Sequence, residues 1–331
     1  MSAPAPWLLL AADESVAGKL VRLVTFQDYN TWAPLVTTAI LGGCAGVVGV
    51  FLVLRGRALV GDVVGHAALP GIGLAFLILE LHTPGAGRST PALLAGALLS
   101  GLAGAICVLV IDRFSRAKAD AALAIVLSLF YGGGIVLLSI VQRFGAGSQA
   151  GLKDYLSGKA ASLVASDAVL TAALTGLVLA ITVALFKEWT LLCFDEGYAA
   201  AQGYPVLRLD ALLIGLTAVV SVLGMQSVGL VLVVALLIIP PAAARFWTDD
   251  IRRMALLAGV MGGLSGALGV AASSLAPRIA TGPTIVLFAT AMFVVSLLAG
   301  RRRGLLWRRH RAGVDGEAGS RTASGGPFAA S

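Results

Sequence analysis

The sequence has very little charge for its length. Of its 331 residues only 12% are Asp, Glu, Lys or Arg, whereas about 25% is typical of a soluble domain. Hydrophobic residues make up 58%, so the composition excludes a water-soluble globule. Apolar runs of about 20 residues, each long enough to cross about 30 Å of hydrocarbon, recur along almost the whole chain. These runs predict an all-α, polytopic membrane protein.

Cysteine and the common catalytic motifs are also scarce. The three cysteines are solitary and lie in or beside apolar runs, which argues against a disulfide framework or a thiolate metal cluster. The sequence contains no Gly-x-x-x-x-Gly-Lys-Ser/Thr loop, so the chain does not bind ATP through that motif. It also lacks the His-Glu-x-x-His and Gly-x-Ser-x-Gly patterns of hydrolases. These absences argue against an intramembrane hydrolase and fit a chain that is not itself an enzyme.

Nine apolar runs are candidate transmembrane helices. They cover residues 34–54, 58–80, 91–111, 121–141, 168–187, 209–226, 228–244, 254–275 and 283–300. Only a short break around Gln226 separates the sixth run from the seventh, so a re-entrant segment or one long broken helix also fits there. Residues 1–33 lack the features of a cleaved signal peptide, and we interpret them as an extracytoplasmic arm before a membrane domain of residues 34–300.

The distribution of positive charge predicts the orientation of these spans. Seventeen of the 24 Lys and Arg residues fall on one side of the nine spans, which the positive-inside rule assigns to the cytoplasm. The N-terminus is therefore expected outside. Residues 301–331, which open Arg-Arg-Arg, are typical of a basic, disordered cytoplasmic tail. Because the net charge of +7 is a topology signal here, we expect no nucleic-acid partner.

The second run contains two ionisable residues, Asp62 and His66. Because such groups are costly inside hydrocarbon, they are the best indication of function in a membrane span. Their separation of four places both on one helix face. Pro70 lies four residues further on and should bend the helix, since it leaves the His66 carbonyl without its helical partner. Oxygen and nitrogen ligands without a thiolate suit Mn, Fe or Zn.

Two other interpretations fit the same pair. Asp62 falls in the first turns of its helix, where the helix dipole favours an anion, and it can simply hydrogen-bond a structural His66. A histidine beside a carboxylate also suits proton transfer. Further along, Glu80 and His82 bracket the outer end of the same run and form either a possible outer metal-receiving site or a solvated loop pair.

Two segments at the predicted cytoplasmic face have their own signals. Residues 195–202, within the loop 188–208, predict a short amphipathic helix capped by Asp195 and ended by Gly203. Such a helix can dock in a groove of a soluble partner or pack on its own bundle. In the seventh run Pro240 and Pro241 free two backbone carbonyls, which fits a hinge or gate and equally fits helix termination.

These motifs resemble a known family. The stretch from Val50 to Gly71, with its Gly-Asp-x-x-x-His-Ala-x-x-Pro-Gly pattern, resembles the signature of permease subunits of manganese, zinc and iron ATP-binding-cassette importers. Residues 194–203, 228–245 and 281–287 resemble the same family, and the resemblance covers about residues 34–300. Two positions depart from the family pattern, since Gly65 replaces the usual serine and Pro241 replaces the usual alanine.

The resemblance implies roles for particular residues. Asp62 and His66 match the aspartate and histidine that line the metal pathway. Asp195, Ala199 and Gly203 match the cytoplasmic helix that docks on the ATPase subunit. No permanently bound cofactor is implied, because the divalent metal is the transported substrate.

The resemblance also implies partners and a location. The expected partners are a cytoplasmic ATP-binding-cassette ATPase, an extracytoplasmic metal-binding protein and a second permease copy or paralogue, all at a bacterial plasma membrane. The alternative is a proton-coupled secondary transporter or channel that works without an ATPase. Such carriers usually have inverted-repeat halves, and none is detectable in this sequence.

Overall fold

The computed structural model describes residues 29–83, 89–142, 165–275, 280–302 and 304. Within these ranges the chain is helical and contains no strand. Most of the predicted arm and most of the predicted tail lie outside them. The helices are α3 (Tyr29–Leu54), α4 (Val60–His82), α5 (Thr90–Phe114), α6 (Ala119–Val141), α8 (Ala165–Ala184), α9 (Phe186–Phe194), α10 (Glu196–Ala201), α11 (Val206–Ser227), α12 (Leu230–Ala244), α13 (Ile251–Leu275) and α14 (Thr281–Ala299).

Eight of these helices are long and apolar enough to cross a membrane, which confirms the predicted fold class. The one remaining predicted span, residues 228–244, corresponds to α12, which has only 15 residues. At 1.5 Å per residue it is about 22 Å long, shorter than the hydrocarbon core. The seventh predicted span is therefore a short helix.

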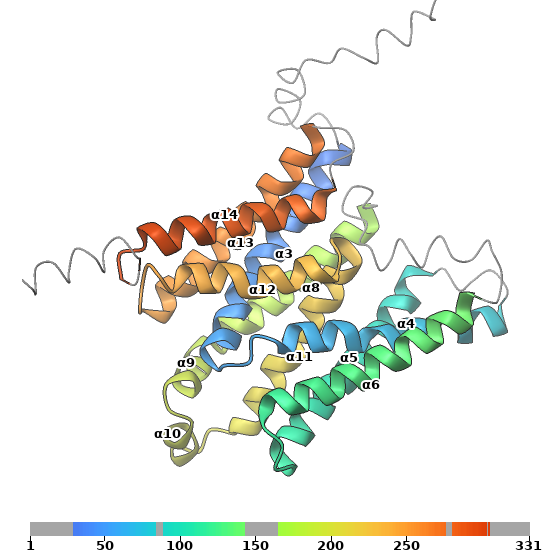
Figure 1. Ribbon diagram of the computed structural model, residues 1–331, viewed down its shortest axis with the longest axis horizontal. Coiled ribbons are helices and arrows are strands. Elements are labelled where there is room, and N and C mark those ends of the chain that lie inside the picture. The colour runs from blue at the N-terminus through green and yellow to red at the C-terminus, as the bar shows by residue number, and fades with distance from the viewer. Residues whose placement is uncertain (1–28, 84–88, 143–164, 276–279, 303, 305–331) are drawn as a thin grey trace, which may run out of the picture.

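The long helices form two groups that meet at α11 (Figure 1). In one group α3 packs against α12 and α13, and α14 covers α12 and α13. In the other group α4 packs against α5 and α6. Because α11 contacts α3 and α12 in the first group and α4 and α5 in the second, it is the central helix of the bundle.

Glycine allows a close backbone contact between α3 and α13. A Cβ atom on Gly42 would collide with the carbonyl oxygen of Gly262, and a Cβ on Gly262 would collide with that of Gly42. In a membrane the hydrophobic effect does not drive helices together, so this close backbone approach supplies the packing. Any larger residue at either position would push the two helices apart.

The sixth and seventh predicted spans are two distinct helices. They are joined by a turn at Gly229, whose φ of 98° is a conformation that favours glycine. Beyond the turn the two helices touch, since the side chain of Val233 packs directly on Gly224. The break around Gln226 therefore marks a tight connection between neighbouring helices.

Some helix ends differ from the prediction. The first helix, α3, begins at Tyr29, and its candidate membrane span begins at Trp32, so the last residues of the predicted arm are helical. The predicted fifth span ran to residue 187, but α8 ends at Ala184 and α9 begins separately at Phe186. Burial of Trp189 explains this second helix, because its indole N–H donates to the Leu209 carbonyl of α11 at 3.1 Å.

Candidate functional site

Asp62 and His66 lie on one face of α4, as their spacing predicts. The His66 Nε2 and Asp62 Oδ1 atoms are 3.5 Å apart, and the two side chains are 28% and 34% exposed. Asp62 is also in the first turn of its helix, where the helix dipole stabilises a carboxylate. Both side chains therefore present polar atoms at a partly open surface of a membrane helix.

The other nitrogen of His66 has no partner. Its Nδ1 atom is buried and makes no hydrogen bond within the described residues. The ring instead stands edge-on to Tyr131 of α6, with 5.0 Å between the ring centroids. Tyr131 is 44% exposed, so the contact closes only one side of the pair. The imidazole is thus oriented by packing rather than by a second hydrogen bond.

The neighbouring helices hold α4 firmly around this pair. Ser221 Oγ of α11 donates to the Gly61 carbonyl at 3.0 Å, and Ser100 Oγ of α5 donates to the Ala67 carbonyl at 2.6 Å. Pro70 lies inside α4, and its ring packs beside Gly134 of α6. The backbone that carries the pair is therefore held by hydrogen bonds from two neighbouring helices, α11 and α5.

Glu80 and His82 lie at the opposite end of α4, in its last turn. His82 is the last helical residue, and its Nδ1 atom is 2.9 Å from the Ile78 carbonyl. Residues two apart in a helix do not face each other. Among the described residues no group of three or more His, Cys, Asp or Glu side chains is suitably placed for a metal, here or around Asp62.

The two adjacent prolines lie inside α12, which continues beyond them to Ala244. Both are buried. Pro241 has no backbone N–H to donate to the carbonyl of Leu237. That carbonyl is directed at Gly49 of α3, where a Cβ atom would collide with it. Close packing against α3 therefore accommodates a break in helical hydrogen bonding without ending the helix.

The predicted cytoplasmic helix is present as α10. Asp195 caps it, and its Oδ1 atom accepts a hydrogen bond from the Tyr198 backbone N–H at 2.9 Å. Gly203 follows with φ of 85°, and nothing lies within 4 Å of the place where its Cβ would be. Ala199 is different, because it is 1% exposed and belongs to the core of this chain. Of the two small residues, Gly203 is therefore open to the surroundings, and Ala199 is buried inside the bundle.

Aromatic packing attaches the preceding helix, α9, to the bundle. The ring centroids of Phe51 and Phe186 are 5.3 Å apart, and those of Phe51 and Trp189 are 5.6 Å apart. Trp189 is fully buried. The segment formed by α9 and α10 is therefore held tightly against α3 and α11 and is not a loose loop.

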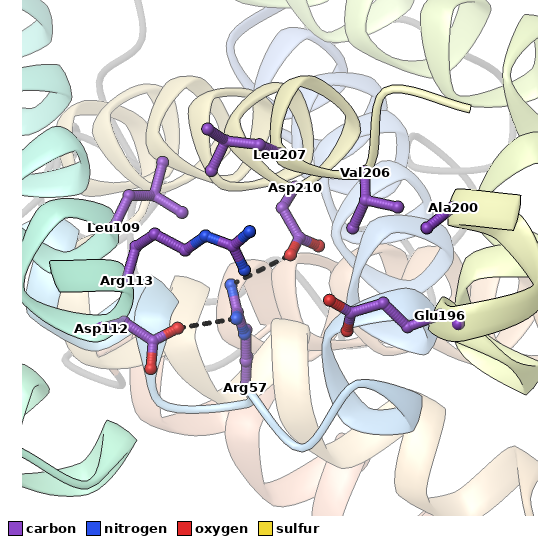
Figure 2. Close-up of a pocket in the computed structure, with 10 residues that line it drawn as sticks. Arg57, Leu109, Asp112, Arg113, Glu196, Ala200, Val206, Leu207 and Asp210 are labelled. Carbon is purple, nitrogen blue, oxygen red and sulfur yellow. Dashed lines mark hydrogen bonds and ion pairs between the residues drawn. The ribbon is translucent and has the colours of Figure 1, made fainter. Parts of the chain in front are cut away.

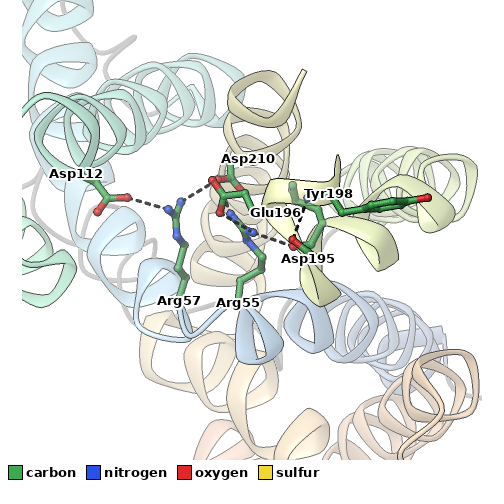
Figure 3. A network of polar contacts seen from close by, with 8 residues as sticks. Arg55, Arg57, Asp112, Asp195, Glu196, Tyr198 and Asp210 are labelled. Carbon is green, nitrogen blue, oxygen red and sulfur yellow. Dashed lines mark hydrogen bonds and ion pairs between the residues drawn. The ribbon is translucent and has the colours of Figure 1, made fainter. Parts of the chain in front are cut away.

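Sequence reasoning missed a cluster of five charged residues at this end of the bundle (Figure 3). Arg55 Nη2 is 2.7 Å from Asp210 Oδ2, and its Nη1 is 3.3 Å from Glu196 Oε2. Arg57 Nη2 is 2.8 Å from Asp112 Oδ2, and its Nη1 is 3.6 Å from Asp210 Oδ2. The arginines had been counted only as topology signals. Asp210, an ionisable residue within a predicted span, was the signal that could have revealed the cluster.

A cavity of about 510 Å³ borders this cluster between α5 and the α10–α11 region (Figure 2). Arg57, Asp112 and Asp210 line it together with Arg113, and Glu196 and Ala200 of α10 form its far wall. Asp62 and His66 are not among its lining residues. The cavity therefore belongs to the end of the bundle that carries α10, and the Asp62–His66 pair is a separate site.

Eight helices of membrane-crossing length define a multi-span membrane protein, and one of them, α4, carries the polar pair. A family model, described as the ABC 3 transport family, matches residues 27–300. The chain belongs to this family, whose members are permease subunits of ATP-binding-cassette importers, and a metal importer permease is the class that its relatives define.

Curated relatives include the manganese transport system membrane protein MntC of Bacillus subtilis, 43% identical over 84% of this chain and 63% of that protein. The chain thus spans less than two thirds of that relative's length. The zinc transport system membrane protein TroC of Treponema pallidum is 39% identical over 91% of this chain and 99% of that protein.

Among solved structures, PsaBC from Streptococcus pneumoniae in complex with Fab matches with a TM-score of 0.73 and 31% identity, over 87% of this chain and 98% of that one. A putative metal-chelate type ABC transporter in an inward-facing conformation shares the fold, at a TM-score of 0.62 and 18% identity.

Proposed function

We propose that this chain is the membrane-spanning subunit of an ATP-driven importer that passes Mn, Zn or Fe along a pathway lined by Asp62 and His66. The observation that carries the proposal is the Asp62–His66 pair itself. It is partly open, it combines oxygen with nitrogen, and it leaves a buried imidazole nitrogen without a partner among the residues that the structure describes. Relatives named for manganese and zinc transport support a divalent metal as the substrate.

One copy of the chain offers too few ligands to hold the ion by itself. Asp62 and His66 supply two side chains, and within the described residues no third His, Cys, Asp or Glu completes a group with them. A second copy or a paralogue related by two-fold symmetry would bring another pair to the same pathway. Four ligands of this mixed kind suit Mn, Fe and Zn.

The energy source is expected in a separate subunit. The α9–α10 segment, with its exposed Gly203, is the docking surface that we propose for the ATPase. On the opposite side, an extracytoplasmic binding protein would deliver the ion, with Glu80 and His82 near the entrance. This arrangement places the end of the bundle with Arg55, Arg57 and Arg245 in the cytoplasm of a bacterial cell.

Reconstitution tests the proposed function. The permease and its ATPase are placed in proteoliposomes, and uptake of Mn²⁺, Zn²⁺ and Fe²⁺ is measured with and without ATP. We expect uptake that requires ATP and shows competition among the three metals. Uptake by the permease alone, driven by a proton gradient, would contradict the proposal and favour a secondary transporter.

The orientation has its own test. Single cysteines are introduced at Tyr204, which is 40% exposed, and at Leu81, which is 69% exposed, and intact cells are treated with an impermeant maleimide. Only the cysteine at position 81 should react from outside. External labelling at position 204 would reverse the orientation and remove α10 from the cytoplasm.

A further inference from the structure

The short connection between α3 and α4 is tied to several helices at once. Arg55 is its first residue, and its guanidinium reaches three of them. It donates to the Leu192 carbonyl of α9 at 3.0 Å, to Glu196 of α10 at 3.3 Å and to Asp210 of α11 at 2.7 Å. The side chains of Arg55 and Asp210 are only 8% and 9% exposed. This is a buried junction between the α9–α10 segment and the central helix.

Arg57 extends the junction to α5, because it forms an ion pair with Asp112, and it also forms an ion pair with Asp210 (Figure 3). The two arginines therefore converge on one carboxylate oxygen, Asp210 Oδ2. Burying this many charges is costly unless they are paired. A positive-inside signal needs no such burial, because exposed arginines provide it equally well.

Backbone hydrogen bonds tie the connection to both α3 and the start of α4. The Arg57 backbone N–H donates to the Leu52 carbonyl at 2.8 Å, and the Val60 N–H donates to the Arg57 carbonyl at 3.1 Å. α4 begins at Val60, so Asp62 lies in the first turn after the connection. A displacement of α10 that acts on Arg55 is therefore applied directly to the start of the helix that carries Asp62 and His66.

The junction also has unused hydrogen-bonding atoms. Arg55 Nε and Asp210 Oδ1 are buried and have no partner among the described residues. A fully satisfied cluster would have one best arrangement, whereas these atoms allow the pairs to exchange when a neighbouring helix shifts. Coupling between distant sites needs an element with two such arrangements.

We propose that Arg55 and Asp210, extended by Glu196, Arg57 and Asp112, form the link that transmits movement of the α9–α10 segment to the start of α4. This inference rests on the proposed function, in which that segment docks on the ATPase. Arg55 is a positioning residue, since it acts on the metal pair through the α3–α4 connection and does not touch the pair itself.

The test uses Arg55→Lys in the reconstituted complex with its ATPase. Lysine keeps the buried positive charge but cannot bond three separated groups in the fork geometry of a guanidinium. We expect Mn²⁺ binding and ATP hydrolysis within about 2-fold of wild type, while the number of Mn²⁺ ions transported per ATP falls at least 5-fold. Arg302→Lys is the matched control, because Arg302 makes an exposed pair with Asp249 at 3.8 Å.

A second variant and a second readout keep the inference falsifiable. Glu196→Gln removes an exposed partner of Arg55 and should lower the transport ratio about 2-fold. A fluorophore on a cysteine at position 59, in a chain without the native cysteines, reports movement of the connection when ATP is added. This signal should shrink in Arg55→Lys at an unchanged rate of ATP hydrolysis.

The outcomes separate this inference from the proposed function. A wild-type transport ratio and a wild-type fluorescence signal in Arg55→Lys would overturn the link. An equal loss of metal binding, ATP hydrolysis and transport would overturn it too, because it would show a purely structural role. A wild-type complex in which ATP moves the fluorophore but no metal is imported would contradict the proposed function and leave the link supported.

Discussion

The two groups of ionisable residues in this molecule differ in how completely they are paired. Asp62 and His66 have a single mutual contact of 3.5 Å and are about one third exposed. In the cluster at the end of the bundle, four ion pairs join Arg55 and Arg57 to three carboxylates, and the central pair is almost fully buried. A pair with one long mutual contact retains capacity for a ligand, whereas most of the polar atoms of the cluster already bond to other protein groups. This difference supports the two proposals, metal binding for the first group and mechanical connection for the second.

The largest effect is expected at the metal pair. Asp62→Ala or His66→Ala should reduce metal uptake by about 100-fold or more, since removing one ligand of so few abolishes the site. Membrane insertion should persist, because deleting an ionisable group makes insertion easier. Uptake in proteoliposomes and the amount of protein in the membrane are measured together. Asp120→Ala is the control, because Asp120 is also an aspartate in the first turn of a membrane helix.

Uptake at the wild-type rate in either alanine variant would remove these residues from the pathway. An equal loss in Asp120→Ala would show that the assay reports helix stability instead of metal transfer.

The buried cluster should matter most for stability. Asp210→Asn removes the buried carboxylate that Arg55 and Arg57 share and leaves Arg55 with only the exposed Glu196. Breaking such a buried pair costs about 3–5 kcal/mol. Thermal unfolding of the purified permease in detergent should therefore move to clearly lower temperature. Arg302→Met, which breaks an exposed pair, should cost no more than about 1 kcal/mol. Equal unfolding temperatures for the two variants would show that the cluster is no more than a set of surface pairs.

The third prediction distinguishes the role of Gly203 from that of Ala199, the two small residues of the α10 region. Gly203→Trp should weaken binding of the ATPase, because its side chain would project into open space at the proposed docking surface. Gly203→Ala carries the same positive-φ strain without the bulk and should retain binding. Ala199→Trp should instead destabilise the permease by about 1–3 kcal/mol, since it overfills the core. Co-purification and thermal unfolding distinguish the two kinds of loss.

If Gly203→Trp binds the ATPase normally, the α10 region packs only on its own bundle. If Ala199→Trp loses the ATPase at full thermal stability, residue 199 is part of the docking surface after all.

The smallest effect concerns Cys193, at the edge of the cluster. Burial raises the pKa of its thiol from an ordinary value near 9 to about 11, an effect that the nearby Arg55 opposes. The raised pKa stabilises the folded state below about pH 9, and this contribution is lost as the pH rises towards 11. Alkylation at pH 7.5, followed by mass spectrometry, should therefore be slow in the folded chain and fast in the denatured one. Equal rates would show that the thiol is not buried.

Much of the fold could be predicted from the sequence. Long apolar runs predicted the helices, because a segment that crosses the hydrocarbon core needs about 20 apolar residues and must form its backbone hydrogen bonds internally. The cap at Asp195 and the glycine at Gly203 also predicted α10 correctly, since both act locally on the backbone. The separate helix α9 was missed, because its position depends on burial of Trp189 between α3 and α11.

The candidate site was likewise predictable from the sequence only in part. The i,i+4 spacing was enough to place Asp62 beside His66, since a helix fixes that geometry by itself. Tyr131 was not predicted, because its contact with His66 joins two helices that are separate in sequence. The burial of Ala199 was not predicted either, and its part in the docking surface stays a prediction. Its size was correctly noted, but only the packing of α10 on the bundle shows which way it faces.

The sequence by itself determined the chemistry that this protein offers: membrane-spanning helices, one carboxylate–imidazole pair and an excess of positive charge at one end. These follow from composition and from spacings of a few residues, which act within a single helix. Only the tertiary structure decided that Arg55, Glu196 and Asp210 meet in one buried junction. Those residues are up to 155 positions apart in the chain, and their meeting depends on how α3, α10 and α11 pack together, which no local pattern specifies.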